Sequence, residues 1–187
     1  RVEPGCWYRD FEKETLRHNL LLPSFPASRE MCAVGGIVAN NSGGEKSLQF
    51  GKTERYVREI KAVLADGNEY SFSRISRAGL EEKMKLPTFE GELYRKMWNM
   101  IQENYDKLRQ AKPKISKNSA GYALWNVWNK EADTFDLTQL LCGSQGTLGI
   151  ITEVTLGLVS PSRHSSLLVI FLKDLEPLAE ITAAVLK

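Results

Sequence analysis

Residues 23–56 read PSFPASREMCAVGGIVANNSGGEKSLQFGKTERY, and two glycine pairs punctuate this stretch, Gly35-Gly36 and Gly43-Gly44. Glycine adopts positive φ and lacks a Cβ, so such a segment can turn sharply and bring backbone amides close to a polar ligand. The pattern predicts a loop that can hold a phosphate or a heteroaromatic ring. A glycine-rich loop between packed elements, with no ligand, is the alternative interpretation.

Between the glycine pairs lie Asn40 and Asn41, whose side chains both donate and accept hydrogen bonds. Asparagine also tolerates the left-handed conformation better than other non-glycine residues. Pro23 and Pro26 exclude helix from the approach to the segment, which we expect to be extended. Residues 32–41 are then expected to form a tight turn and a short helix, whose amino-terminal amides and partial positive charge suit a pyrophosphate or a carbonyl group.

A second glycine-spaced segment, residues 141–153, reads LCGSQGTLGIITE and leads into an alternating apolar run. In this run Ile150, Val154, Leu156 and Leu158 alternate with polar or small residues, which is the period of a half-buried strand. A second segment of this kind favours a ligand-binding role over a simple packed loop.

Composition excludes several classes of protein. With 187 residues, 42% of them hydrophobic, the chain can bury a core of its own. The formal net charge of +2 gives no global field that would favour nucleic acid or an anionic membrane surface as partner. Because the sequence has neither an apolar run of transmembrane length nor an amino-terminal signal pattern, we expect no membrane span and a cytoplasmic location.

The cysteines and histidines do not predict a metal site. Cys6, Cys32 and Cys142 are widely separated and odd in number, which argues against a disulfide framework or a zinc site and fits a reducing compartment. His18 and His164 lie far apart in the sequence with no cluster of carboxylates around them. We therefore expect no bound metal.

The amino-terminal part of the chain predicts one helix and one hairpin. An apolar stripe on one side of residues 10–19 predicts a short amphipathic helix. Residues 56–65 are rich in β-branched side chains, and Asp66-Gly67 is a strong hairpin signal, so an antiparallel strand pair is expected there.

The middle of the chain predicts two helices. Apolar residues at helical spacing predict a helix over 91–111 that ends before Pro113, and Asp136 is expected to cap a short helix that ends at Leu141. A basic cluster near the end of the longer helix is most simply a solvated helix end and only weak evidence for a polyanion site. This cluster comprises Lys107, Arg109, Lys112, Lys114 and Lys117.

Pro161 marks a boundary in the pattern. Beyond it, residues 167–172 form a continuous apolar run that predicts a buried strand, and Asp174 is expected to cap a last helix. The organisation expected is therefore a domain over 1–160 and the start of a second domain over 161–187.

Four motifs in a fixed order resemble the FAD-binding domain of the vanillyl-alcohol oxidase type, specifically the FAD-linked oxidases that include glycolate oxidase, D-lactate dehydrogenase and D-2-hydroxyglutarate dehydrogenase. They are PASREMCAVGGIVANNSGG at 26–44, FGKTERYV at 50–57 leading to VLADG, KNSAGY at 117–122, and FDLTQLLCGSQGTLGIITEVTLGLV at 135–159. Their order and spacing are far more specific than any one of them.

The resemblance implies an α+β fold, the second half of such an FAD-binding domain, with an antiparallel sheet flanked by helices. Residues 1–160 would then be its second subdomain and residues 161–187 the start of the substrate cap domain. The cofactor implied is FAD. Contacts with it, mostly through backbone, are expected from Ser28, Cys32, Ala33, Gly35, Gly36, Asn40, Asn41, Gly43, Gly44, Gly149, Ile150 and Ile151.

The activity implied for the parent protein is oxidation of a small-molecule 2-hydroxy acid by hydride transfer to the flavin, with an iron–sulfur domain or subunit as one candidate electron acceptor. The sequence assigns no catalytic residue. Cys32 is expected to be a small filler near the cofactor and not a covalent flavin link. The 187-residue chain alone is expected to be inactive and to bind FAD weakly, since the family's pyrophosphate loop should precede Arg1.

The sequence departs from the family pattern at two places, and three alternative interpretations remain open. Gln145 replaces the usual glutamate, and the segment between Phe72 and Lys117 is longer than in many relatives. The alternatives are an aldonolactone-type or cytokinin-type oxidase of the same superfamily, the reductase of bacterial cell-wall precursor synthesis, and a fragment without catalytic function of its own.

Overall fold

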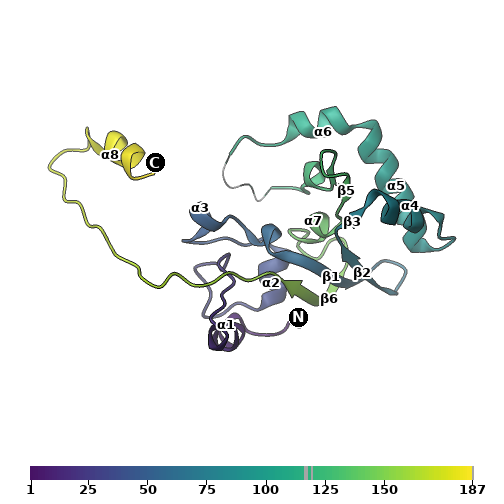
Figure 1. Ribbon diagram of the computed structural model, residues 1–187, viewed down its shortest axis with the longest axis horizontal. Coiled ribbons are helices and arrows are strands. Elements are labelled where there is room, and N and C mark those ends of the chain that lie inside the picture. The colour runs from purple at the N-terminus through teal and green to yellow at the C-terminus, as the bar shows by residue number, and fades with distance from the viewer. Residues whose placement is uncertain (116–117, 119, 187) are drawn as a thin grey trace.

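The central element of the fold is a three-stranded antiparallel sheet (Figure 1). The structure is a computed structural model that describes residues 1–115, 118 and 120–186. The strand order is β2-β1-β6, with β1 at Val57–Val63, β2 at Glu69–Ser73 and β6 at Ile150–Leu156. The predicted hairpin and the predicted strand after the second glycine segment are thus neighbours in one sheet.

A second, smaller sheet and the helices complete the α+β architecture that the sequence predicts. The small sheet has the order β3-β5-β4, with β3 at Ile75–Ser76, β5 at Thr134–Phe135 and β4 at Trp128–Asn129. The helices are α1 (Tyr8–Arg17), α2 (Val34–Ala39), α3 (Ser47–Phe50), α4 (Arg77–Lys85), α5 (Phe89–Glu103), α6 (Tyr105–Ala111), α7 (Thr138–Leu141) and α8 (Leu178–Val185), with short 3₁₀ turns η1 (Thr53–Arg55) and η2 (Leu124–Asn126). Among the described residues, none of these helices is long and apolar enough to cross a bilayer.

The main core lies between the central sheet and helices α2, α5 and α7. Val34 of α2, Ile60 of β1 and Leu141 of α7 belong to one buried cluster, which also holds Val154 of β6. The register pairs Ile60 with Phe72 on one side and with Val154 on the other, so alternate residues of β1 point into this cluster. The short helix α2 is therefore fixed by its apolar side chains, because a helix of this length has little stability of its own.

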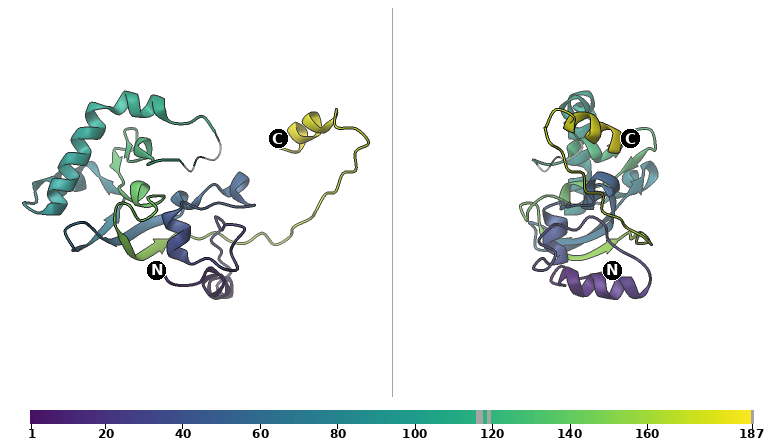
Figure 2. Two further views of the ribbon diagram at one scale, coloured as in Figure 1. Left: turned by 180° about the vertical axis from the view of Figure 1, so that it is seen from behind. Right: turned by 90° about the vertical axis from the view of Figure 1, so that its left-hand side faces the viewer.

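The first 25 residues pack beside α2. Helix α1 covers most of the predicted range 10–19 but begins two residues earlier, at Tyr8, whose ring is fully buried against Leu22 and Phe25. The Tyr8 hydroxyl donates to the carbonyl oxygen of Leu22 at 3.1 Å. Figures 1 and 2 show α1 on one side of the central sheet and the α5–α6 pair on the other.

The predicted helix over 91–111 is two helices. Helix α5 ends at Glu103 and α6 begins at Tyr105, with Asn104 between them at φ −114° and ψ 15°. The Asn104 side chain donates to the carbonyl oxygen of Met100 at 2.9 Å and so competes with the helical backbone. Helix α4, which the sequence pattern did not reveal, precedes them and begins at Arg77, after its N-cap Ser76, whose side chain accepts from the Gly79 amide at 3.3 Å.

Asp136 acts near the start of α7 but is not its N-cap. Leu137 occupies that position, and Asp136 Oδ1 accepts a hydrogen bond from the Thr138 amide at 3.1 Å. The carboxylate thus satisfies one amide of the first turn from one residue further upstream than expected.

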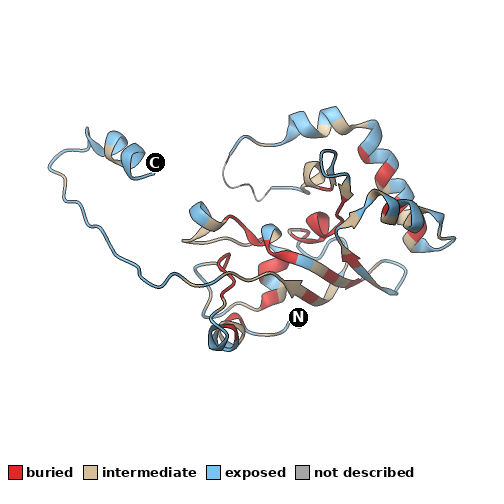
Figure 3. Cartoon of the chain, in the orientation of Figure 1, coloured by how far each residue is buried: buried red, intermediate tan, exposed pale blue. Residues whose placement is uncertain are grey.

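The buried strand predicted over 167–172 is wrong. Residues 167–172 form no strand and are mostly exposed (Figure 3). Leu167 and Phe171 are 88% and 93% exposed. A continuous apolar run becomes a strand only where a sheet edge receives it, and none of the described residues offers one here. The last helix, α8, begins after Pro177 and not at Asp174, and it too is mostly exposed. The assignment of 161–187 to a cap domain stays a prediction.

Candidate cofactor-binding site

The amino-terminal end of α2 is closed by the chain's own first residues. The amide of Val34 donates to the carbonyl oxygen of Cys6 at 2.9 Å, and the amide of Gly35 donates to that of Pro4 at 2.8 Å. A Cβ on Gly35 would lie 2.5 Å from Pro4 Cβ. The expectation that these amides await a pyrophosphate is therefore wrong for Val34 and Gly35, because both already have partners inside the protein.

The second glycine pair also serves close packing. A Cβ on Gly44 would lie 2.3 Å from the carbonyl oxygen of Phe25, and the Gly44 amide donates to Ser47 Oγ at 2.7 Å. A Cβ on Gly43 would meet Ser47 Oγ at 2.4 Å. Gly36 differs from the other three glycines, since it is exposed and an added Cβ would meet nothing within 4 Å.

The carboxyl-terminal end of α2 receives the second glycine segment. The amide of Gly143 donates to the carbonyl oxygen of Val38 at 3.0 Å, and the amide of Gln145 donates to that of Ala39 at 2.9 Å. These bonds satisfy two of the carbonyls that a helix end leaves without partners. Gln145 makes this contact through its backbone, and the residue is exposed. The presence of glutamine where the family usually has glutamate therefore leaves the contact intact.

A pocket of about 270 Å³ opens beside this junction. All four motifs that carry the family resemblance contribute to its walls. The contributing residues are Asn40 and Asn41 from the first motif, Gly51, Lys52, Glu54 and Arg55 from the second, Asn118, Ala120 and Gly121 from the third, and Cys142 and Gly143 from the fourth. Two further residues of the third motif, Lys117 and Ser119, lie outside the described residues.

The two asparagines have different roles in this wall. Asn41 is 7% exposed at φ 45°, and its side chain forms a paired contact with Glu54: Oδ1 accepts from the Glu54 amide at 3.0 Å and Nδ2 donates to the Glu54 carboxylate. Asn41 thereby holds η1 against the end of α2. Asn40 is exposed, and no hydrogen bond within the described ranges uses its side-chain amide. Asn40 is thus available to a ligand as both donor and acceptor.

The second and third motifs are joined directly. Lys52 is 5% exposed, and its Nζ donates to the carbonyl oxygen of Asn118. Thr53, next to it, donates from its amide to the carbonyl oxygen of Ser42 at 3.0 Å and from its hydroxyl to the same oxygen at 2.8 Å. These bonds fix the loop after the second glycine pair and with it the position of the pocket wall.

The remaining predicted cofactor residues do not line this pocket. The last group, Gly149, Ile150 and Ile151, lies at the start of β6, where Ile150 pairs with Val63 and is 71% exposed. Ser28 is exposed in a turn. The six other predicted residues also lie outside the pocket: Cys32, Ala33, Gly35 and Gly36 are around the start of α2, and Gly43 and Gly44 form the second glycine pair. The structure brings Asn40 and Asn41 to the pocket and leaves this group outside it.

The cysteines near the site are protonated thiols at neutral pH. Burial raises the pKa of Cys32, whose carbonyl oxygen accepts from the Tyr8 amide at 2.9 Å, and burial raises the pKa of Cys142 further above its usual range. Because the thiolate is the nucleophile, these environments are those of packing residues. That Cys32 is a small filler near the cofactor stays a prediction.

Sequence reasoning missed several wall residues, although signals for them were present. Gly51 and Lys52 lie in FGKTERYV, Asn118 lies in KNSAGY, and Gly143 lies in the second glycine segment. The motifs were recognised, but periodicity and spacing cannot show that segments this far apart in the sequence share one wall. Trp125, which also lines the pocket, belongs to no motif.

Comparison with known protein families identifies the amino-terminal part. Residues 1–73 match the family model described as "FAD binding domain". The chain is thus similar to this FAD-binding family over its first 73 residues, less than half of its length. FAD is accordingly the cofactor of the family, and the match covers the first two of the four motifs, including both glycine pairs.

Curated relatives extend the similarity beyond the FAD-binding match. The chain is 34% identical over 123 residues, 66% of its length, to D-2-hydroxyglutarate dehydrogenase of Pantoea ananatis. It is 29% identical over 166 residues, 89% of its length, to D-lactate dehydrogenase of Archaeoglobus fulgidus, and 29% identical over 171 residues, 91% of its length, to glycolate oxidase subunit GlcD of Bacillus subtilis. It spans only 12% of the first relative and 26% and 25% of the other two.

The donors in the pocket fit a portion of FAD. The side-chain amide of Asn40 both donates and accepts hydrogen bonds and so suits hydroxyl, carbonyl or phosphate oxygens. A volume of about 270 Å³ lies below the range of about 300–1,000 Å³ that is usual for sites enclosing a whole ligand of drug size. These residues would therefore hold one part of the cofactor.

Proposed function

We propose that this chain is part of an FAD-dependent dehydrogenase or oxidase that oxidises a 2-hydroxy acid by hydride transfer to the flavin, and that the pocket at the carboxyl-terminal end of α2 is a surface on which FAD lies. The single observation that carries the proposal is the convergence of four separate motifs on one pocket, within a chain whose first 73 residues match an FAD-binding family model. The names of the relatives support the substrate class.

In this proposal the chain binds and orients the cofactor. FAD when bound supplies the hydride acceptor. Asn40 donates and accepts hydrogen bonds at the pocket surface, while Asn41 and Lys52 keep the wall in place through Glu54 and Asn118. The residues that would bind the 2-hydroxy acid and remove its hydroxyl proton are not assigned to this chain.

The test uses purified full-length protein. Its visible spectrum should show bound flavin in about equimolar amount, and anaerobic addition of D-2-hydroxyglutarate, D-lactate or glycolate should bleach that spectrum with one of the three acids. A preparation without flavin would contradict the assignment of the cofactor. Bound flavin that none of the three acids reduces would leave the cofactor assignment standing and contradict the substrate class.

We further propose that the 187-residue chain alone binds FAD weakly and is inactive, that the parent protein is cytoplasmic, and that it passes electrons to an iron–sulfur domain or subunit. A net hydrogen bond contributes about 1 kcal/mol, and association costs roughly 4 kcal/mol or more of rigid-body freedom, so one partial pocket should not give tight binding. Titration of FAD into the isolated chain, followed by flavin fluorescence, should show no one-to-one endpoint at micromolar concentrations. A sharp endpoint would contradict the proposal of weak binding.

A further inference from the structure

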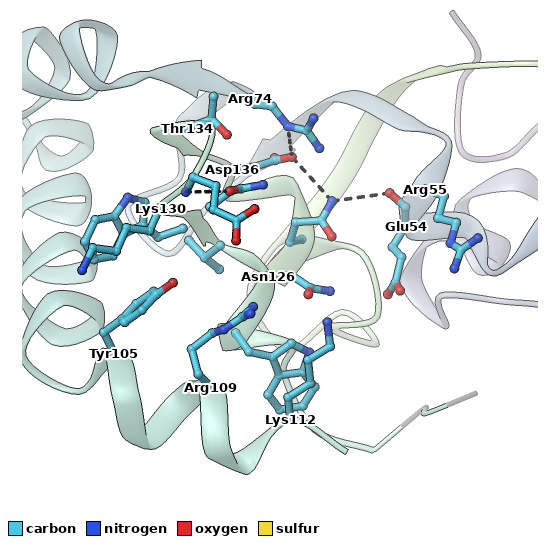
Figure 4. A pocket seen from close by; sticks show the side chains of 16 residues that line it. Glu54, Arg55, Arg74, Tyr105, Arg109, Lys112, Asn126, Lys130, Thr134 and Asp136 are labelled. Atoms are coloured by element: carbon cyan, nitrogen blue, oxygen red, sulfur yellow. Dashed lines mark hydrogen bonds and ion pairs between the residues drawn. The ribbon is translucent and has the colours of Figure 1, made fainter. Parts of the chain in front are cut away.

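A second pocket, larger than the proposed flavin surface, lies where α6 faces the small sheet and α7 (Figure 4). Its volume is about 420 Å³. Arg109 and Lys112 approach from the end of α6, Arg55 from η1, and Arg74 from the connection between β2 and β3. The motifs that carry the family resemblance contribute little to this pocket, because much of its wall belongs to the long segment after Phe72.

The charge lining this pocket is positive. Five cations face it, namely Arg55, Arg74, Arg109, Lys112 and Lys130, against the three acids Glu54, Glu131 and Asp136. Arg74 Nε lies 3.4 Å from Asp136 Oδ2, and Lys130 lies over the ring of Tyr105 at 5.5 Å. Within the described part of the chain, Arg55, Arg109 and Lys112 form no ion pair. Three guanidinium or ammonium groups are thus available to an anion at the pocket's mouth.

The inner wall of this pocket is aromatic and polar. Trp125, Trp128 and Tyr105 line it, and Trp128 Nε1 is buried with no hydrogen-bond partner among the described residues. Asp136 and Gln139, 5% and 7% exposed, complete the wall, with Gln139 Nε2 donating to the Glu54 carbonyl oxygen at 3.4 Å. An aromatic surface beside carboxylate and amide groups suits a flat heterocycle that carries both donors and acceptors.

We propose that this pocket binds a nucleoside polyphosphate, with the phosphates among Arg55, Arg109 and Lys112 and the base against Trp125. The volume of about 420 Å³ falls within the range usual for sites that enclose a small organic ligand and is larger than an inorganic anion needs. The two pockets adjoin, since Glu54, Arg55, Lys112, Trp125 and Asn126 line both, whereas Arg74, Arg109 and Trp128 line only the larger one. A nucleotide here would therefore lie next to the bound cofactor.

The test is titration of ATP into purified, flavin-loaded full-length protein by calorimetry. We expect one site per chain. Adenosine and tripolyphosphate should each bind at least about tenfold more weakly than ATP, because adenosine lacks the phosphates and tripolyphosphate lacks the base. The variant Arg109→Ala/Lys112→Ala should lower ATP affinity by about tenfold or more, the loss expected for charge-assisted hydrogen bonds. The matched control, Lys107→Ala/Lys114→Ala, removes the same charge from nearby exposed lysines that do not line the pocket and should leave affinity within about twofold.

Four results would overturn this proposal: no ATP binding, equal losses in the two double variants, tripolyphosphate binding as tightly as ATP, or release of flavin by ATP. Equal losses would mean a general charge effect, and equal binding of tripolyphosphate would mean that the base is not recognised. Flavin content, read from the absorbance of the same samples, separates failure of this proposal from failure of the proposed function.

Discussion

The two ends of helix α2 contrast in what surrounds them. At the amino-terminal end, Pro4 and Cys6 accept hydrogen bonds from the first amides and leave no room for a side chain on Gly35. At the carboxyl-terminal end, the amides of Gly143 and Gln145 cover two carbonyls, and the adjoining surface is hollowed into a pocket. A single glycine-rich motif therefore serves packing at one end of its helix and borders a candidate ligand surface at the other.

The largest effect on this comparison is expected from Gly44→Ala. The new Cβ would lie 2.3 Å from the carbonyl oxygen of Phe25, and backbone on both sides resists movement because Thr53 also anchors Ser42. Forcing an extra methyl group into such a site costs about 1–3 kcal/mol of unfolding free energy. Urea denaturation followed by circular dichroism measures the loss. A change below about 0.5 kcal/mol would show that this glycine is not required for packing.

The neighbours Gly35 and Gly36 give a matched pair at the closed end of the helix. Gly35→Ala should lower the free energy of unfolding by about 1–3 kcal/mol, since its Cβ would meet Pro4 at 2.5 Å. Gly36→Ala should be neutral or stabilise the protein by up to about 1 kcal/mol, because its position is open and alanine is the better helix former. Equal effects of the two substitutions would contradict the contrast between a packed and an open glycine.

Cys142, at the junction of the two glycine segments, is expected to make the stability of the fold depend on pH. Burial raises the pKa of its thiol, so the folded state keeps the proton while the unfolded state loses it above about pH 8.5–9. The contribution of Cys142 to the free energy of unfolding is therefore fully present below that pH. It falls as the pH rises, by at most about 1.4 kcal/mol per pH unit. Between pH 8.5 and 10, Cys142→Ala should show a shallower decline in urea midpoint than the wild type. Parallel declines would contradict this assignment.

The smallest effect is expected in the exposed carboxyl-terminal segment. Phe171→Ser should change the free energy of unfolding by less than about 0.5 kcal/mol, because Phe171 is 93% exposed and has little buried apolar surface to lose. The same substitution at Phe72, which is 1% exposed, serves as the reference for a core position and should cost several kcal/mol. A large loss for Phe171→Ser would show that the segment packs against the rest of the chain.

The contrast between Phe72 and Phe171 also shows what sequence patterns can predict. Alternation over 56–65 and the Asp66-Gly67 turn correctly predicted the hairpin, because both signals are local. The apolar run over 167–172 gave a wrong strand, because a strand needs a partner edge that a pattern cannot reveal. Likewise, helical spacing over 91–111 did not reveal the break at Asn104, which depends on one side chain bonding to Met100.

The same difference between local signals and distant contacts applies to the residues of the pocket. Local chemistry was enough to select Asn40 and Asn41, which line the pocket, and to mark Gly35 and Gly44 as positions that need glycine. Whether such a glycine admits a ligand or another part of the chain depends on what packs there, here Pro4 and Phe25. The contribution of Asn118 depends on a contact with Lys52 across the fold, which no spacing along the sequence encodes.

The most direct measurement of the central claim is the dissociation constant of FAD from full-length Asn40→Leu. Asn40 is exposed, lines the pocket and forms no side-chain hydrogen bond within the described ranges, so leucine should not disturb the fold. Gln102→Leu, an equally exposed change on α5 away from both pockets, is the matched control. We predict that Asn40→Leu weakens FAD binding by about tenfold or more, the loss of one or two hydrogen bonds and of space, while the control retains wild-type affinity. Unchanged affinity in Asn40→Leu would contradict the claim that FAD lies at the carboxyl-terminal end of α2.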